Sequence, residues 1–242
     1  MTNIAYPATL ASRYGNTLHL LLCLIAAATV SLSLGAHAQR TTLTLSDGSE
    51  LKVLFFSPES TDSKQTWPLA VMVAGGSGNE VMVRAQFGFG NELRNRGWAI
   101  AVPVSPDGQP FADTGENLLP LMMQALQEKH PLLSEKALLV GMSSGGSAAL
   151  EVGTSIPEYF SGILVVPGQI EATKELADLT ELPIFIRIGE NDSFQWNKGL
   201  PAMAARLKEA GAIVDAELVS GARHVFRLGW EDIDPWLATL QN

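Results

Sequence analysis

Cysteine is almost absent from this chain of 242 residues, with Cys23 as the single copy. Because Cys23 lies in a stretch that has the pattern of a removable leader, the rest of the chain can form neither a disulfide nor a thiolate nucleophile. Histidine is also scarce, since only His130 and His224 lie beyond residue 38. A cluster of His, Cys and carboxylate ligands for a metal ion is therefore not expected.

Positive charge is the second shortage. Lysine and arginine together number 16 against 25 aspartates and glutamates, which gives a formal net charge of −9. Nucleic acids and anionic membrane surfaces are bound largely through clusters of basic side chains. The charge balance therefore argues against either as a partner and is typical of an ordinary acidic, soluble protein.

Residues 1–38 differ from the rest of the chain. Arg13 is their only lysine or arginine, an apolar run covers 18–34, and Ala36-His37-Ala38 has the A-x-A form of a cleavage site. This is the layout of a secretory signal peptide. We therefore expect an exported protein, periplasmic or secreted, whose mature domain spans 39–242 and keeps no stable membrane partner. An uncleaved leader would instead anchor the protein in a membrane, because the apolar run is about as long as the shortest spans.

Strand and helix patterns alternate along the mature region. After a hairpin over 41–56 that turns at Asp47-Gly48, apolar runs predict strands at 68–73, 98–104, 137–140, 162–166, 183–188 and 213–219. Helices are expected at 79–96, 117–130, from the serine turn to about 157, and at 171–180, 201–210 and 232–240. This order predicts an α/β fold, with one mostly parallel twisted sheet, helices on both faces and a leading antiparallel hairpin.

The stretch 137–147 carries the strongest chemical signal. Four apolar residues lead into Gly141-Met142-Ser143-Ser144-Gly145, a G-x-S-x-G sequence, and small residues follow. The central serine of such a turn has a strained backbone, so the residues two before and two after it must lack a Cβ. Ser143 is therefore the candidate nucleophile. The amide of Ser144, at the start of the next helix, is a candidate donor to an oxyanion.

A serine hydroxyl near neutral pH needs a base to take its proton. His224 follows the last expected strand, which places it at the same edge of the sheet as the serine turn. His130 ends a helix at the opposite edge, where we expect a solvated surface residue. The base needs a carboxylate that sets its tautomer. The loop after strand 183–188 offers Asp192, with Glu190 as the competitor.

The segment Ala74-Gly75-Gly76-Ser77-Gly78 follows the first buried strand. Its amides can approach a substrate closely, so Gly76 or Ser77 is expected to supply the second bond to an oxyanion. No Gly-Lys-Ser/Thr follows as in a phosphate cradle, and the glycine order is not that of a dinucleotide site, so no cofactor is expected. Apolar side chains on the same edge are candidates for contact with the substrate, although such residues also often belong to the core: Met142, Phe194, Trp196 and Phe226.

In the order serine, acid, histidine, three segments resemble those of the α/β-hydrolase superfamily: Gly141 to Gly145, Gly189-Glu190-Asn191-Asp192, and Gly221-Ala222-Arg223-His224. The resemblance covers essentially the whole mature chain. Within the superfamily the sequence is similar to small serine esterases near dienelactone hydrolase, phospholipase/carboxylesterase and polyhydroxybutyrate-depolymerase-like proteins. Serine stands where dienelactone hydrolases have cysteine, which favours ordinary esters. Ala74 stands where many esterases have the histidine of H-G-G-G.

The resemblance implies a serine hydrolase that cleaves carboxylic esters through an acyl-enzyme intermediate. Only about sixteen residues separate Val166 from Pro183, too few for the helical lid of true lipases, so small or polymer-end esters are expected as substrates. A peptidase or an acyltransferase with the same triad is the nearest alternative. A non-catalytic binding protein of the same fold is the alternative from a different class.

Overall fold

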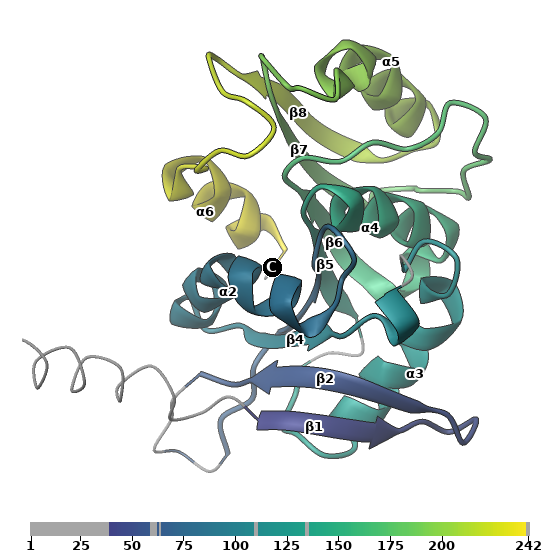
Figure 1. Cartoon of the computed structure of the whole chain (residues 1–242), viewed down its shortest axis with the longest axis vertical. Coiled ribbons are helices and arrows are strands. Elements are labelled where there is room, and N and C mark those ends of the chain that lie inside the picture. The colour runs from purple at the N-terminus through teal and green to yellow at the C-terminus, as the bar shows by residue number, and fades with distance from the viewer. Residues whose placement is uncertain (1–38, 59–61, 63, 109–110, 134–135, 241–242) are drawn as a thin grey trace, which may run out of the picture. The chain divides into compact units, whose positions relative to one another are not determined.

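The computed structural model of the chain describes residues 39–58, 62, 64–108, 111–133 and 136–240 (Figure 1). The expected leader, residues 1–38, lies outside these ranges, so its cleavage stays a prediction. Of the helices in the described ranges, none has the length and apolar character needed to cross a membrane.

The strands form one eight-stranded mixed sheet with the order β1-β2-β4-β3-β5-β6-β7-β8. Their bounds are β1 (Gln39–Thr44), β2 (Glu50–Phe56), β3 (Leu69–Val73), β4 (Ala99–Pro103), β5 (Ala137–Gly141), β6 (Phe160–Val165), β7 (Pro183–Gly189) and β8 (Ile213–Val219). The pairs β1–β2 and β2–β4 are antiparallel, and all the others are parallel. The predicted leading hairpin and mostly parallel sheet are confirmed.

The interior strands are continuous apolar runs because both faces of the sheet are covered. Every residue of β3, β4 and β5 is buried. The edge strand β8 is partly exposed instead, and Ile213 is 61 % exposed. The strands β4, β3, β5, β6, β7 and β8 are parallel neighbours in that order, so their carboxyl ends lie at one edge of the sheet, where the loops that follow them meet.

Helices cover both faces of the sheet (Figure 1). Their bounds are α2 (Glu80–Asn95), α3 (Gly115–Gln127), α4 (Ser144–Ser155), α5 (Trp196–Glu209) and α6 (Trp230–Thr239), with short 3₁₀ turns η1 (Pro106–Gly108) and η2 (Pro157–Tyr159). On one face, Leu93 of α2 and Ile233 of α6 share a core with alternate strand residues. On the other face, Leu119, Ala149 and Leu207 of α3, α4 and α5 share the second core. The predicted coverage of both faces is confirmed.

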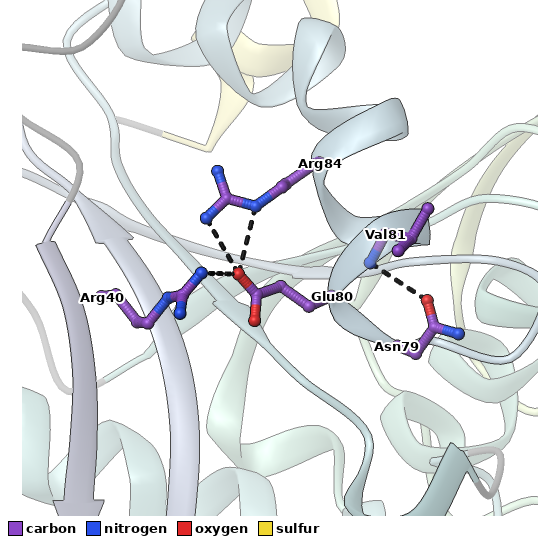
Figure 2. Close-up of polar contacts among 5 residues, drawn as sticks. All are labelled: Arg40, Asn79, Glu80, Val81 and Arg84. Atoms are coloured by element: carbon purple, nitrogen blue, oxygen red, sulfur yellow. Dashed lines mark hydrogen bonds and ion pairs between the residues drawn. The ribbon is translucent and has the colours of Figure 1, made fainter.

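Side chains fix the start of α2 (Figure 2). The side chain of Asn79 accepts a hydrogen bond from the amide of Val81 at 3.1 Å and so caps the helix. The Glu80 carboxylate accepts a hydrogen bond from Arg84 at 2.8 Å and also forms an ion pair with Arg40 of β1. The hydrogen bond from Arg84, together with the positive charge of Arg40, lowers the pKa of the Glu80 carboxyl group. The first turn of α2 is thus tied to the leading hairpin.

One predicted helix is absent, because residues 171–180 form turns and irregular backbone. Two of its carbonyl groups accept hydrogen bonds from a neighbouring helix: Arg206 of α5 donates to the carbonyl oxygens of Glu171 at 3.0 Å and Lys174 at 2.5 Å. A short polar segment gains little from helix formation by itself, so these tertiary bonds decide its path. The described chain between β6 and β7 accordingly contains no helix that could act as a lid.

Candidate active site

The serine turn lies between β5 and α4, where Ser143 has φ = 56° and ψ = −127°, a conformation rare for any residue except glycine. A Cβ on Gly141 would collide with the carbonyl oxygen of Gly145, and a Cβ on Gly145 would collide with that of Val73. The amide of Ser143 donates to the carbonyl oxygen of Pro167 at 2.8 Å, and its side chain does not cap α4. The hydroxyl is therefore available to a partner outside the turn.

That partner is His224, which lies in the loop after β8. The Nε2 atom of His224 is 2.7 Å from the Oγ of Ser143, and its Nδ1 is 2.7 Å from the Oδ2 of Asp192. The side chain of Asp192 is fully buried and that of His224 is 10 % exposed. A carboxylate that accepts the Nδ1–H leaves Nε2 with the lone pair that can accept the serine proton.

The two acidic residues on the loop after β7 have different partners. Asp192 accepts a hydrogen bond from the amide of Phe194 at 2.7 Å on Oδ1, so both of its oxygens are used. The Oε2 of Glu190 accepts from the amide of Gly221 at 2.8 Å and from the hydroxyl of Ser220 at 3.3 Å. Only Asp192 faces the imidazole, whereas Glu190 holds the turn at the end of β8.

Backbone contacts join the acid-bearing loop to the histidine-bearing loop. The amide of Asn191 donates to the carbonyl oxygen of Ala222 at 2.8 Å. A Cβ on Gly189 would collide with the carbonyl oxygen of Arg223, the residue before the histidine. The chain that carries His224 thus crosses directly over the end of β7, and only glycine leaves room for it there.

Of the four apolar residues expected to contact substrate, two lie against the imidazole. The ring centroids of Phe194 and Trp196 are 4.5 Å and 5.0 Å from that of His224, with the rings at steep angles. Trp196 can take part because α5 begins there, five residues before the start that Pro201 suggests in the sequence. The other two, Met142 and Phe226, are partly buried against the core under α2 and α6.

The glycine-rich segment after β3 lies against the serine turn. A Cβ on Gly75 would be 2.5 Å from the carbonyl oxygen of Met142, and the hydroxyl of Ser144 donates to the carbonyl oxygen of Gly76 at 3.1 Å. The amide of Gly75 is already bonded to the Oε1 of Gln86 at 2.8 Å. Within the described ranges, the amides of Gly76 and Ser144 have no hydrogen-bond acceptor.

Peptide planarity separates the two expected donors, Gly76 and Ser77. In a trans peptide the carbonyl group and the next N–H point in opposite directions. Because the carbonyl oxygen of Gly76 faces the hydroxyl of Ser144, the amide of Ser77 points away from it. The carbonyl oxygen of Gly75 accepts from Gly78 at 3.3 Å in a tight turn, with φ = 66° at Gly76. This geometry favours the amide of Gly76 over that of Ser77.

The other histidine of the mature chain lies in a separate environment. His130 stacks on Phe55, with ring centroids 4.0 Å apart, and is partly buried, so the expectation of a solvated surface residue is only partly correct. Burial, and then the charge of Lys129, lowers the pKa of His130 below its usual value of 6.5. No group of three or more His, Cys, Asp or Glu side chains in the described ranges is arranged to hold a metal ion.

Residues 109–233 match the sequence model of the dienelactone hydrolase family. This stretch is more than half of the chain and contains the serine turn, Asp192 and His224. The chain belongs to the dienelactone hydrolase family. No curated protein matches the sequence closely enough to be counted as a relative.

Solved structures agree on the fold of this dienelactone hydrolase family member. A bacterial heroin esterase superposes with a TM-score of 0.65 at 16 % identity, over 95 % of this chain and 91 % of that one. The Bacillus cereus carboxylesterase superposes with a TM-score of 0.62 at 17 % identity, over 78 % of this chain and 94 % of that one. The Porphyromonas gingivalis dipeptidyl peptidase 4 superposes with a TM-score of 0.67 at 13 % identity, over 85 % of this chain but only 35 % of the peptidase. This chain therefore spans about a third of that protein. Family and fold together identify a hydrolase of the α/β-hydrolase superfamily.

Proposed function

We propose that this hydrolase cleaves carboxylic esters through an acyl-enzyme intermediate formed on Ser143. The observation that carries the proposal is the line of two hydrogen bonds, each 2.7 Å, from the Ser143 hydroxyl through His224 to the buried Asp192. These two bonds activate the weakly nucleophilic serine hydroxyl, because the carboxylate of Asp192 holds the imidazole of His224 in the tautomer that accepts a proton and stabilises its charged form. The esterases among the similar structures support an ester as the substrate.

In the acylation step, the Oγ of Ser143 attacks the carbonyl carbon of the ester while the Nε2 of His224 accepts its proton. Negative charge develops on the carbonyl oxygen. The amides of Ser144 and Gly76 are the proposed donors to it, and the N-terminus of α4 adds a favourable dipole at Ser144. The imidazolium then protonates the oxygen of the leaving alcohol, the ester C–O bond breaks, and the acyl group stays on Ser143.

Deacylation repeats the same steps with water. His224 takes a proton from a water molecule, the resulting hydroxide adds to the acyl carbon, and the bond to Ser143 breaks as His224 returns the proton to the serine oxygen. Throughout the cycle the two oxygens of Asp192 accept hydrogen bonds from the Nδ1 of His224 and the amide of Phe194. Its proposed role is to orient the imidazole and to stabilise its charged form.

The proposed substrate is a small ester or the end of a polymeric ester, with an apolar acyl or alcohol group. Phe194 contacts the ring of His224 and is 65 % exposed, and Val225, the residue after His224, is 85 % exposed. The described chain between β6 and β7 contains no helix. Exposed apolar side chains beside a nucleophile suit an apolar substrate part. We propose that Trp196, Met142 and Phe226 extend this contact surface.

The test is hydrolysis of a series of p-nitrophenyl esters together with labelling by a fluorophosphonate. Removal of the hydroxyl in Ser143→Ala should reduce kcat by a factor on the order of 10⁴ or more and abolish labelling. Ser161→Ala, on β6, is the matched control and should change neither. Activity retained in Ser143→Ala would overturn the mechanism, and folded wild-type protein that resists labelling would favour a non-catalytic binding protein.

A peptidase is the second candidate, favoured by the TM-score of 0.67 with a dipeptidyl peptidase. Hydrolysis of peptidyl p-nitroanilides compared with the matching esters separates the two, and we expect the esters to be the better substrates. The same assays with added alcohols distinguish an acyltransferase, because transfer would yield a new ester in place of the free acid.

A further inference from the structure

A side chain outside the proposed triad reaches the segment 74–78, here called the oxyanion loop. Gln86 lies on α2 and is half-buried, and its Oε1 accepts a hydrogen bond from the amide of Gly75 at 2.8 Å. We propose that Gln86 is a positioning residue, which aims the amide of Gly76 at the developing oxyanion through this bond. The inference rests on the proposed function.

The oxyanion loop has few means of its own to hold one conformation. Three of its five residues are glycine, and glycine loses more conformational freedom on ordering than any other residue. The peptide before the donor, Ala74–Gly75, is held by Gln86, and the peptide after it, Gly76–Ser77, is held by the hydroxyl of Ser144 at 3.1 Å. The peptide between them carries the Gly76 amide, so its plane is set from both sides.

Gln86 can act as a fixed point because its helix is fixed. The Asn79 cap and the contacts of Glu80 with two arginines secure the first turn of α2 (Figure 2). Val83 near the start of the helix and Leu93 near its end are both buried against the sheet. A group on a packed helix positions a reacting partner better than one on a loop can.

The second support of the loop comes from the serine turn itself. Through its hydroxyl, Ser144 holds the carbonyl of Gly76, while its own amide is the other proposed donor. The two donors are therefore linked to each other on one side, and Gln86 links the loop to α2 on the other. Gly75 lies so close to the serine turn that a Cβ there would be 2.5 Å from the Met142 carbonyl oxygen, so the position has room only for glycine.

Loss of the Gln86 bond should affect the transition state more than the bound substrate. The oxyanion exists only in the transition state and tetrahedral intermediate, so a donor that has to be reordered at that moment lowers kcat and leaves KM nearly unchanged. Removal of a whole oxyanion donor costs about 10² to 10³ in kcat. Loosening one should cost less, on the order of 10-fold.

The experiment compares wild-type enzyme with Gln86→Leu, which removes the acceptor at similar size, and with Gln86→Glu, which keeps one. Gln124→Leu makes the same change on the exposed side of α3 and is the matched control. The measurements are kcat and KM on a p-nitrophenyl ester, Ki for a trifluoromethyl ketone that forms a tetrahedral adduct with serine, and hydrogen exchange of the 74–78 amides.

For Gln86→Leu we expect kcat to fall and Ki to rise by about the same factor, near 10-fold, with KM within about twofold of wild type. Exchange at Gly75 should become faster, and Gln86→Glu should restore slow exchange. Gln124→Leu should match wild type in every measurement. If Gln86→Leu does not fold, Gln86→Ala, which adds no bulk, takes its place in the same set of measurements.

Wild-type kcat and wild-type exchange in a folded Gln86→Leu enzyme would overturn the inference. A lower melting temperature with unchanged kcat and Ki would do the same, because it would show a merely structural role. These failures leave the wild-type enzyme active. Wild-type protein that neither hydrolyses esters nor reacts with a fluorophosphonate would overturn the proposed function itself, so the two failures are distinguishable.

Discussion

The Cα of Gly189, the last residue of β7, lies directly under the carbonyl oxygen of Arg223, with no room for a Cβ between them. Three residues after Gly189 comes Asp192, and one residue after Arg223 comes His224. The hydrogen bond between that acid and that imidazole is 2.7 Å long. The crossing at Gly189 therefore sets the distance between the loops from which the proposed acid and base project.

Gly189→Ala should disturb the spacing between the proposed acid and the proposed base. The added methyl group has to push the histidine loop away, so we expect kcat to fall by about 10²-fold and the unfolding free energy to fall by about 1–3 kcal/mol. Gly199→Ala, on the exposed side of α5 with nothing within 4 Å of the new Cβ, is the control and should be neutral or stabilising by up to about 1 kcal/mol. Equal behaviour of the two variants in kinetics and denaturant unfolding would contradict the steric argument.

Asp192→Asn should separate charge from packing at the buried carboxylate. The amide keeps an oxygen for the Phe194 N–H but loses the charge that balances the imidazolium, and it can stabilise the wrong tautomer of His224. We expect kcat to fall by about 10³ to 10⁴ with the fold intact. Steady-state kinetics and circular dichroism check this. A loss below tenfold would remove Asp192 from its proposed role.

Glu190→Ala should loosen the turn before the histidine without touching the triad. Its carboxylate holds the amide of Gly221 at 2.8 Å, and removing it frees a loop whose position the base depends on. We expect a fall in kcat of roughly five- to tenfold, and Glu190→Gln, which keeps an acceptor, should recover most of it. Glu209→Ala on α5 is the control for loss of an exposed charge. No difference between Glu190→Ala and this control would show that the bond is not needed.

His130 should make folding stability fall in mild acid. Its pKa is lowered in the folded state, chiefly by burial, so the unfolded chain binds the proton more readily than the native protein does. The contribution of the neutral ring is complete above pH 6.5, and it is lost as the pH falls below 6.5 towards the lower folded-state pKa. Melting temperatures of wild type and His130→Phe from pH 7.5 to 5 check this, since the variant keeps an aromatic ring on Phe55 but cannot titrate. Parallel pH curves for the two proteins would contradict it.

The leader should be removed after Ala38. Cleavage there would release a mature chain that begins at Gln39, the first residue of β1. Intact mass of protein recovered from outside the cytoplasm checks this. Recovery of full-length chain in the membrane fraction would favour the uncleaved anchor instead.

Local rules were enough to predict much of the molecule from its sequence. Continuous apolar runs separated by helical patterns predict a mostly parallel sheet, because strands covered on both faces need apolar residues throughout. The glycines around Ser143 predict the turn. Since the carboxyl ends of parallel strands share one edge, the position of His224 after the last strand predicts that it lies near Ser143. Each of these steps uses only spacing along the chain and the geometry of one element.

The remaining choices depended on contacts between segments far apart in the chain. Asp192 and Glu190 are two residues apart on one loop, and the path of the histidine loop over Gly189 decides which one meets the imidazole. The choice of Gly76 over Ser77 follows from the bond between Ser144 and the Gly76 carbonyl, and the contact of Gln86 with the oxyanion loop has no signal in the sequence. Residues 171–180 likewise follow bonds from α5 instead of their local helical preference. The order of strands, helices and motifs in the sequence determined the fold and the place of the site. Tertiary packing decided the direction of each polar group, because hydrogen bonds depend on orientations and distances that spacing along the sequence does not specify.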